Sequence, residues 1–252
     1  HSGGYPILDI MSDDAYKGSN PTDQQSNVGP FDVFAFTSTQ DGLDRWWNAL
    51  YEGVRRTNVV IEKVPSISMN EELKTNYIAQ AKFLRALYYF NLVRMFKNIP
   101  LLTEPLTSEQ IYTVTQAAPG DVYAQIETDL TEAIPDLPLT VPASSEGGRL
   151  SQGSAKALLG KVYLYENKNT EAAAQLAEVN GTPGGVSQYG YSLLTNYNDL
   201  WVFSNKFNSE SIIEVTHSNQ VALGDWSLWG SSRDESNTVN QMVGPRSYQK
   251  TA

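Results

Sequence analysis

The side chains best suited to chemistry lie late in the chain, where aromatic and charged residues share a short polar stretch. Trp226, Trp229 and Arg233 fall within the run from Asp225 to Glu235. Sugars present flat faces of C–H groups rimmed by hydroxyls, so proteins bind them with aromatic platforms flanked by polar groups. This pattern predicts a carbohydrate contact. The alternative is that both tryptophans pack the loop onto the scaffold, because large aromatic side chains are usually mostly buried.

Carboxylates in the same stretch raise a second possibility, hydrolysis of a glycosidic bond. A glycosidase holds two carboxyl groups about 5 to 10 Å apart across the bond, one of them with a raised pKa. Asp225, Asp234 and Glu235 could supply such a pair. The chain has no zinc-protease, nucleophile-elbow, P-loop or dinucleotide motif. Charged residues in polar loops are generally exposed to solvent and have no catalytic role. Carbohydrate binding is therefore preferred to hydrolysis.

Composition excludes several other classes of function. The chain has 18 basic and 28 acidic residues, a formal net charge of −10, so nucleic acid is not an expected partner. It has no cysteine, which excludes disulfides, thiolate metal sites and cysteine nucleophiles. No cofactor and no metal site are predicted. A run of about 18 consecutive apolar residues, as a membrane-spanning helix needs, is missing.

The elements that must position these side chains are mainly helices, over roughly residues 41–180. Apolar residues at steps of three or four predict helices over Leu43–Glu62, Tyr77–Phe96 and Pro119–Ile134. A further pair is expected from the spacing of Leu159, Gly160, Tyr163, Ala172 and Leu176, which fits a degenerate tetratricopeptide unit, in which small residues let the two helices approach. The sequence thus predicts a mostly α fold, built on a scaffold of tetratricopeptide-like helix pairs.

Residues 185–252 have a different texture, with short apolar runs between Asn, Ser and Gly. This predicts irregular loops and a few short strands, at Tyr191–Leu194, Trp201–Phe203 and Ile212–Thr216. We expect residues 1–252 to form a single domain that is the N-terminal portion of a longer protein.

Several motifs together resemble the SusD/RagB family of glycan-binding lipoproteins. Conserved family helices have the forms A-x-x-L-R-A-x-x-Y-F-x-L-V-R-x-F and W-x-x-L-Y-x-x-I-x-R-x-N. The chain matches the first at Ala81–Phe96 and the second at Trp47–Asn58, with Val54 in place of the usual isoleucine. Arg85 and Arg94 in the first match are expected to be structural, because they lie beside aromatic residues of the helix on which their stems can pack. Arg149–Tyr165 and Glu210–Val215 resemble two further family blocks, in the family's order.

The resemblance implies a non-catalytic protein that captures oligosaccharides or polysaccharides and delivers them to a SusC-like, TonB-dependent transporter. It also implies a location at the outer-membrane surface, through a lipid anchor that this chain lacks. A tetratricopeptide adaptor that binds only proteins is the remaining alternative.

The family's ligand face implies further site residues near the N-terminus. They are Asp13 and Asp14 in a Ser-Asp-Asp stretch and the aromatic residues Phe36 and Trp46. Trp46 lies about 100° around the helix from the apolar stripe that contains Trp47, so it is available for a ligand or for a second packing partner. For the two aspartates the alternative is an exposed turn or helix cap.

Overall fold

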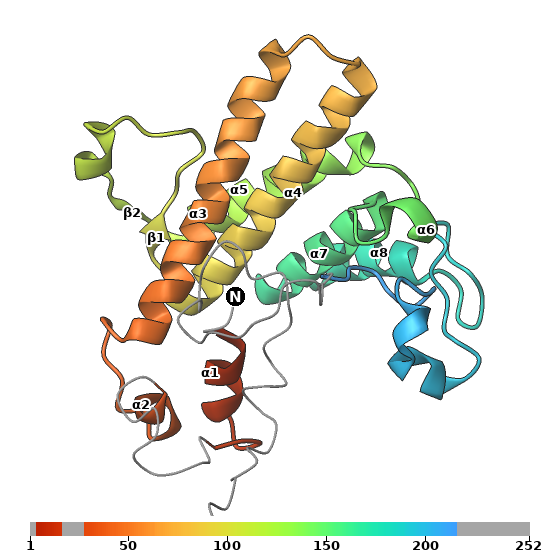
Figure 1. Ribbon diagram of the computed structural model, residues 1–252, viewed down its shortest axis with the longest axis horizontal. Helices are drawn as coiled ribbons and strands as arrows, with labels where there is room; N and C mark the ends of the chain where they lie inside the picture. The colour runs from red at the N-terminus through yellow and green to blue at the C-terminus, as the bar shows by residue number, and fades with distance from the viewer. Residues whose placement is uncertain (1–3, 17–27, 216–252) are drawn as a thin grey trace, which may run out of the picture. The chain divides into compact units, whose positions relative to one another are not determined.

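The computed structural model describes residues 4–16 and 28–215. Residues 50–215 form one compact unit, and the described residues before Leu50 belong to another. The prediction of a mostly helical fold is confirmed, because helices account for most of the described chain (Figure 1).

A long helical hairpin lies at the start of the larger unit, and the part of its first helix before Leu50 belongs to the other unit. Helix α3 covers Asp41–Lys63 and helix α4 covers Glu71–Phe96, joined through the 3-10 turn η1, Val64–Ser66. Figure 1 shows the two helices running antiparallel, side by side. Their close approach depends on Gly53, because a Cβ atom there would lie 2.5 Å from the ring of Tyr88.

Helix α4 begins at Glu71 rather than at Tyr77, the start predicted from apolar periodicity. The Asn70 side chain accepts a hydrogen bond from the Leu73 N–H at 3.0 Å and thereby caps the helix. Glu72, like Glu71, adds negative charge to the first turn, where the helix dipole favours it. A polar helical turn of this kind leaves no apolar periodicity to detect.

Helix α5, Pro119–Ala133, packs along α4 and is followed by the 3-10 turn η3, Ile134–Asp136. The connection between α4 and α5 contains the 3-10 helix η2, Gln110–Thr113. It also forms a two-residue antiparallel ladder, in which β1, Ile99–Pro100, pairs with β2, Gln116–Ala117.

The second helix pair follows the short helix α6, Ala143–Glu146. Helices α7, Gln152–Tyr165, and α8, Asn169–Asn180, pack on each other, and α7 also packs on α5. Gly160 permits the contact of α7 with α8, because a Cβ atom there would lie 2.7 Å from Cγ of Leu176. The small-residue contact predicted for this pair is confirmed.

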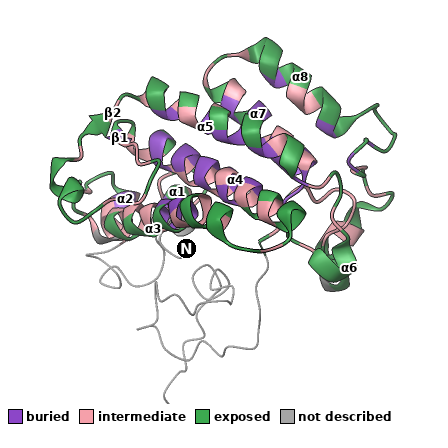
Figure 2. Ribbon diagram, turned by 90° about the horizontal axis from the view of Figure 1, so that it is seen from above, coloured by how far each residue is buried: buried purple, intermediate pink, exposed green. Residues whose placement is uncertain are grey.

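The hydrophobic core of this unit lies between α4, α5 and α7. Figure 2 shows buried residues along α4 and along the neighbouring helices. Phe83, Tyr89, Ile126, Leu130 and Val162 are among the side chains that are almost completely buried. Their burial accounts for the three- and four-residue spacing seen in the sequence.

A buried ion pair ties these helices together. The Arg85 guanidinium on α4 donates to both carboxylate oxygens of Asp129 on α5, at 2.8 and 2.6 Å. It also donates to Asn58 Oδ1 on α3 and to the Thr103 carbonyl oxygen, both at 2.9 Å. Arg85 is therefore structural, as its place beside the apolar stripe predicted.

Tyrosine hydroxyls hold the extended chain that follows β1 against the helices. Tyr51 donates to the Pro100 carbonyl at 2.7 Å, and Tyr89 donates to the Leu102 carbonyl at 2.7 Å. Burial raises the pKa of Tyr89 to about 12, so its hydroxyl remains a donor at physiological pH. These hydrogen bonds hold the extended chain against the helices without a long β-strand.

After α8 the chain is irregular, with the 3-10 helices η4, Tyr197–Trp201, and η5, Phe203–Asn205. Residues 181–215 contain no strand, so the strand predictions were wrong for Tyr191–Leu194, Trp201–Phe203 and the described part of Ile212–Thr216. The Leu194 N–H donates to the Glu210 carboxylate at 2.6 Å. Side-chain acceptors of this kind replace the backbone partners that a ladder requires.

In the other unit, the described helices are short. Helix α1 covers Gly4–Ile10 and α2 covers Gly29–Asp32, and these two helices are in contact. Phe31 is fully buried.

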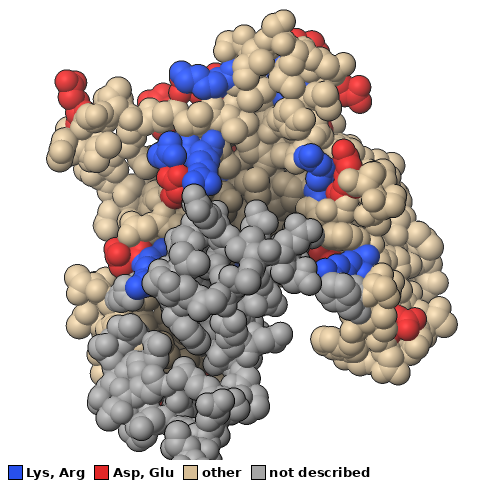
Figure 3. All heavy atoms as spheres, in the orientation of Figure 1, with Lys and Arg blue, Asp and Glu red and all other residues tan. Residues whose placement is uncertain are grey.

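Most of the described lysine and arginine side chains form ion pairs with carboxylates. On the face shown in Figure 3, blue and red spheres occur in small mixed groups, and its described part has no extended basic area. Examples are Arg55 with Glu52 at 2.8 Å and Lys82 with Glu132 at 2.8 Å. None of the helices in the described segments is long and apolar enough to cross a membrane.

Candidate functional site

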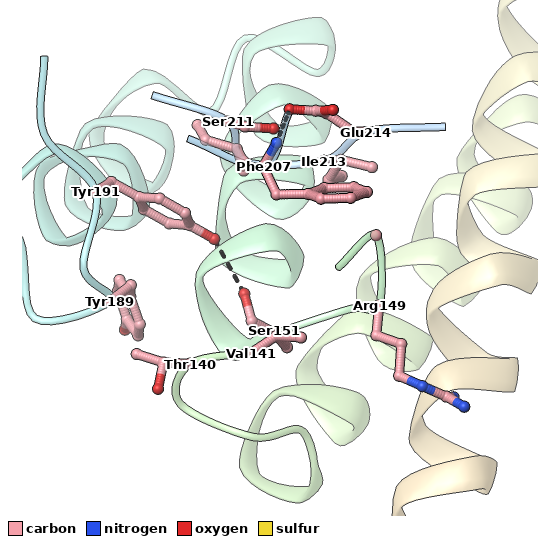
Figure 4. Close-up of a pocket in the computed structure, with 12 residues that line it drawn as sticks. Thr140, Val141, Arg149, Ser151, Tyr189, Tyr191, Phe207, Ser211, Ile213 and Glu214 are labelled. Carbon is pink, nitrogen blue, oxygen red and sulfur yellow. Dashed lines mark hydrogen bonds between the residues drawn. The ribbon is translucent and has the colours of Figure 1, made fainter. Parts of the chain in front are cut away.

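The irregular segment after α8 and the chain before α7 enclose a small cavity of about 70 Å³ (Figure 4). Its walls come from residues 140–151, 189–191 and 207–214, so three separate stretches of the larger unit build it. Aromatic rings, hydroxyl groups and one carboxylate face one another there, as Figure 4 shows.

One wall is built from two tyrosines. The rings of Tyr189 and Tyr191 have centroids 6.4 Å apart, and the Tyr191 hydroxyl lies 3.0 Å from Ser151 Oγ. Burial raises the pKa of Tyr191, which keeps its hydroxyl neutral. Gly153 makes room for the pair, because a Cβ atom there would lie 2.5 Å from the Tyr191 ring.

Ser151 is held in place by the start of α7. Its side chain accepts from the Ser154 N–H at 3.2 Å, and Ser154 Oγ accepts from the Ser151 N–H at 2.8 Å. This reciprocal capping box satisfies donors that a helix N-terminus otherwise leaves free. It positions the serine hydroxyl that meets Tyr191.

The opposite wall is the ring of Phe207. This residue has a φ of +55°, a left-handed conformation that costs a non-glycine residue roughly 1 kcal/mol or more. Its N–H donates to Glu214 Oε1 at 2.8 Å. Gly147 lies beneath the ring, where a Cβ atom would be 2.4 Å from Cδ2. These contacts hold Phe207 in a backbone conformation that is unfavourable by itself.

The pocket can bind part of a polar, ring-shaped ligand but lacks the parts of a glycosidase. Glu214 is the single carboxylate among its lining residues. Arg149 extends away from the cavity, as Figure 4 shows, and approaches Glu146 at 3.9 Å. A volume of about 70 Å³ accommodates roughly two water molecules or the edge of a sugar ring, not a whole oligosaccharide.

The site residues predicted near the N-terminus have different environments. Asp13 and Asp14 are exposed in a turn after α1, where the Asp14 N–H donates to Ser12 Oγ at 3.2 Å. Phe36 is half-buried and stacks on Phe31, with ring centroids 4.9 Å apart. Trp46 is half-buried on α3. The role of each as a ligand contact stays a prediction.

The other predicted contacts, Trp226, Trp229 and Arg233, lie outside the described residues. The same holds for Asp225, Asp234 and Glu235, the carboxylates weighed for hydrolysis. Within the described ranges, no group of three or more histidine, aspartate or glutamate side chains is arranged to hold a metal ion.

Sequence reasoning missed the pocket. Tyr189 and Tyr191 stand two residues apart in a polar stretch, and this alternation was the available signal. Phe207 and Glu214 gave no comparable signal, because their hydrogen bond depends on a left-handed backbone conformation at Phe207 that residue types alone do not indicate.

The larger unit thus combines a helical scaffold with an irregular segment that lines an aromatic cavity. The family model for SusD-like proteins, described as starch-binding and associating with the outer membrane, matches residues 9–164. Since this match covers more than half of the sequence, the chain belongs to the SusD-like family. The resemblance seen in its helix motifs is confirmed.

Solved structures support this assignment. A laminarin-binding SusD-like protein is 50% identical, with a TM-score of 0.89 over 96% of this chain and 52% of its own. Surface glycan-binding protein A from Bacteroides uniformis is 25% identical, with a TM-score of 0.72 over 84% of this chain and 46% of its own.

Curated relatives give the same result. A SusD-like protein of Bacteroides ovatus is 30% identical over 79% of this chain and 37% of its own length. A SusD-like protein of Formosa agariphila is 26% identical over 81% of this chain and 38% of its own length. The chain therefore spans well under half the length of these two relatives. These proteins are named for what they resemble or bind, not for a reaction.

Proposed function

We propose that this chain is the glycan-binding N-terminal part of a non-catalytic SusD-like protein that captures oligosaccharides or polysaccharides. The observation that carries the proposal is the relation to the laminarin-binding protein, which is 50% identical over nearly the whole of this chain. At such identity the backbone and most of the binding surface are expected to be similar. Neutral glucans such as laminarin are the first ligand class to test.

The test is native affinity electrophoresis of the 252-residue chain in gels that contain laminarin, xyloglucan, starch or an anionic polysaccharide. Retardation by a glycan, without new shorter sugars when the mixture is analysed by chromatography, is the expected result. Released sugars would instead favour the glycosidase alternative. A chain that migrates equally in every gel would contradict glycan capture, and the protein-binding adaptor would then be the remaining interpretation.

Within this function we assign the main ligand contacts to Trp226, Trp229 and Arg233, together with Trp46, Phe36, Asp13 and Asp14. Stacking on the tryptophans supplies affinity, and the polar side chains supply specificity. Trp226→Ala and Trp229→Ala should reduce retardation while the far-ultraviolet circular dichroism stays unchanged. Full retardation of both variants would remove this stretch from the site.

We further propose that the whole protein resides at the outer-membrane surface through a lipid anchor and delivers its ligand to a SusC-like, TonB-dependent transporter. The family description, which includes association with the outer membrane, supports the location. Co-purification of the full-length protein with the transporter from detergent-solubilised membranes, and its digestion by protease added to intact cells, are the expected results. A protease-resistant protein that purifies alone would overturn both assignments.

A further inference from the structure

An exposed aromatic pair, Tyr197 and Trp201, lies on η4, and neither residue is among the site residues assigned above. The side chain of Trp201 is 75% exposed and that of Tyr197 is 68% exposed. Their ring centroids are 6.2 Å apart and their planes meet at 70°, so the two rings form an open corner. Single exposed aromatic residues are common on protein surfaces, whereas a group of adjacent exposed rings can mark a binding surface.

Local hydrogen bonds hold this corner in shape. Asn196 caps η4, accepting from the Asn198 N–H at 3.2 Å and donating to the Asp199 carboxylate at 3.2 Å. Asn205 donates to the Asp199 carbonyl at 3.0 Å and so ties η5 to η4. An aromatic surface that is ordered before binding loses less conformational entropy when a ligand arrives.

The size of the corner fits a sugar better than a protein. Two aromatic side chains present at most about 300 to 500 Å². A stable protein interface buries about 800 Å² on each partner. One or two pyranose rings, by contrast, are matched in area by an indole face and a neighbouring phenol ring. The turn also carries amide groups, on Asn196 and Asn198, that can bond to sugar hydroxyls.

Charge narrows the ligand class to neutral glycans. Between Asn196 and Lys206 the chain has one acidic residue, Asp199, and one basic residue, Lys206 itself. Neither sign dominates the turn, and the chain as a whole has a net charge of −10, which repels polyanions.

We infer that Tyr197 and Trp201 form a second glycan-stacking platform, which binds pyranose rings of a neutral polysaccharide in addition to the contacts assigned to Trp226 and Trp229. The inference rests on the proposed function, because it adds a second contact to the same polysaccharide. Two contacts on one polymer raise its apparent affinity through effective concentration, even where each contact is weak.

The experiment compares the full chain with its Trp201→Ala, Trp201→Phe and Tyr112→Ala variants in laminarin gels, with alginate gels as the anionic arm. Tyr112 is 89% exposed on η2, so it is a matched control for the loss of an accessible aromatic ring elsewhere. Thermal unfolding and sedimentation velocity are measured on every variant.

Trp201→Ala is expected to bind laminarin about tenfold more weakly, the scale on which loss of an anchoring aromatic residue weakens binding. Trp201→Phe should recover part of the affinity, and Tyr112→Ala should bind as the unmodified chain does. No form should be retarded by alginate.

Other results overturn the inference in distinguishable ways. If the unmodified chain is retarded by laminarin and Trp201→Ala is retarded equally, the second platform is wrong and the proposed function stands. If the unmodified chain is not retarded by any polysaccharide, the proposed function itself fails. If Trp201→Ala changes only the sedimentation coefficient, the corner is a contact between copies of the chain.

Discussion

Arg85 should be essential to stability, because its guanidinium neutralises a carboxylate that is almost shut off from water. The side chains of Arg85 and Asp129 are 6% and 1% exposed. Removing one member of such a pair leaves the other charge buried without a partner, which costs about 3 to 5 kcal/mol. Arg85→Met should lower the free energy of unfolding by that amount in urea titrations followed by circular dichroism.

The double variant Arg85→Met with Asp129→Leu is the control for this prediction. It removes both charges, so it should recover much of the loss. Arg55→Met breaks an exposed ion pair with Glu52 and should have little effect. A single variant as stable as the unmodified chain would show that the pair is solvated in solution.

Glu166 should destabilise the folded chain at neutral pH. Burial, followed by contact with the Glu127 carboxyl group, raises its pKa above the ordinary 4.5. Within the described residues, Glu166 Oε2 is buried without a hydrogen-bond partner. Because the folded state holds this proton more tightly than the unfolded state, stability is lost as the pH rises through the raised pKa.

Glu166→Gln is therefore expected to raise the unfolding temperature near pH 7, with the gain shrinking as the pH falls through the raised pKa and absent below about 4.5. Glu178→Gln is the control of opposite sign, because Lys156 at 2.9 Å lowers the pKa of Glu178. Its loss of stability should be present at neutral pH and disappear in acid. Parallel pH profiles of the two variants would contradict both assignments.

At the scale of the elements, the contact between α7 and α8 depends on the absence of a side chain at Gly160. A methyl group at this position would lie 2.7 Å from Leu176 Cγ. Gly160→Ala should lower the free energy of unfolding by about 1 to 3 kcal/mol, although alanine is the better helix former. Chemical denaturation measures the change.

Gly120→Ala is the matched control, because a Cβ atom at Gly120 on α5 would have no neighbour within 4 Å. There the alanine should leave stability unchanged or raise it by up to about 1 kcal/mol. Equal effects of the two substitutions would mean that backbone entropy, not helix packing, determines the cost at Gly160.

At the scale of the whole molecule, binding to a neutral glycan should not depend on salt. Stacking and hydrogen bonds to uncharged hydroxyls are not screened, whereas contacts between charges weaken as the Debye length shrinks from about 10 Å at 0.1 M to about 3 Å at 1 M. Laminarin retardation should therefore stay constant when sodium chloride is raised over this range. Affinity that falls steeply with salt would indicate a charged ligand and contradict the neutral-glycan assignment.

The sequence alone predicted the helices and the family, and both predictions are confirmed. A glycan ligand stays a proposal. Apolar residues at three- and four-residue steps record which side of each helix is buried, so Leu43–Glu62, Tyr77–Phe96 and Pro119–Ile134 could be located without any contact information. The prediction that Arg85 is structural and that Gly160 brings two helices together was also confirmed. The prediction of a single domain remains a prediction.

Only the tertiary structure decided the conformation of the irregular segment that follows α8. Ile212, Ile213 and Val215 have the composition of a strand, but the Phe207 and Leu194 N–H groups bond to glutamate side chains instead of a neighbouring strand. Local composition cannot reveal whether a strand has a partner. Likewise, the Tyr189–Tyr191 pocket and the exposed Tyr197–Trp201 corner depend on which residues distant in sequence meet, and on which rings the fold leaves uncovered.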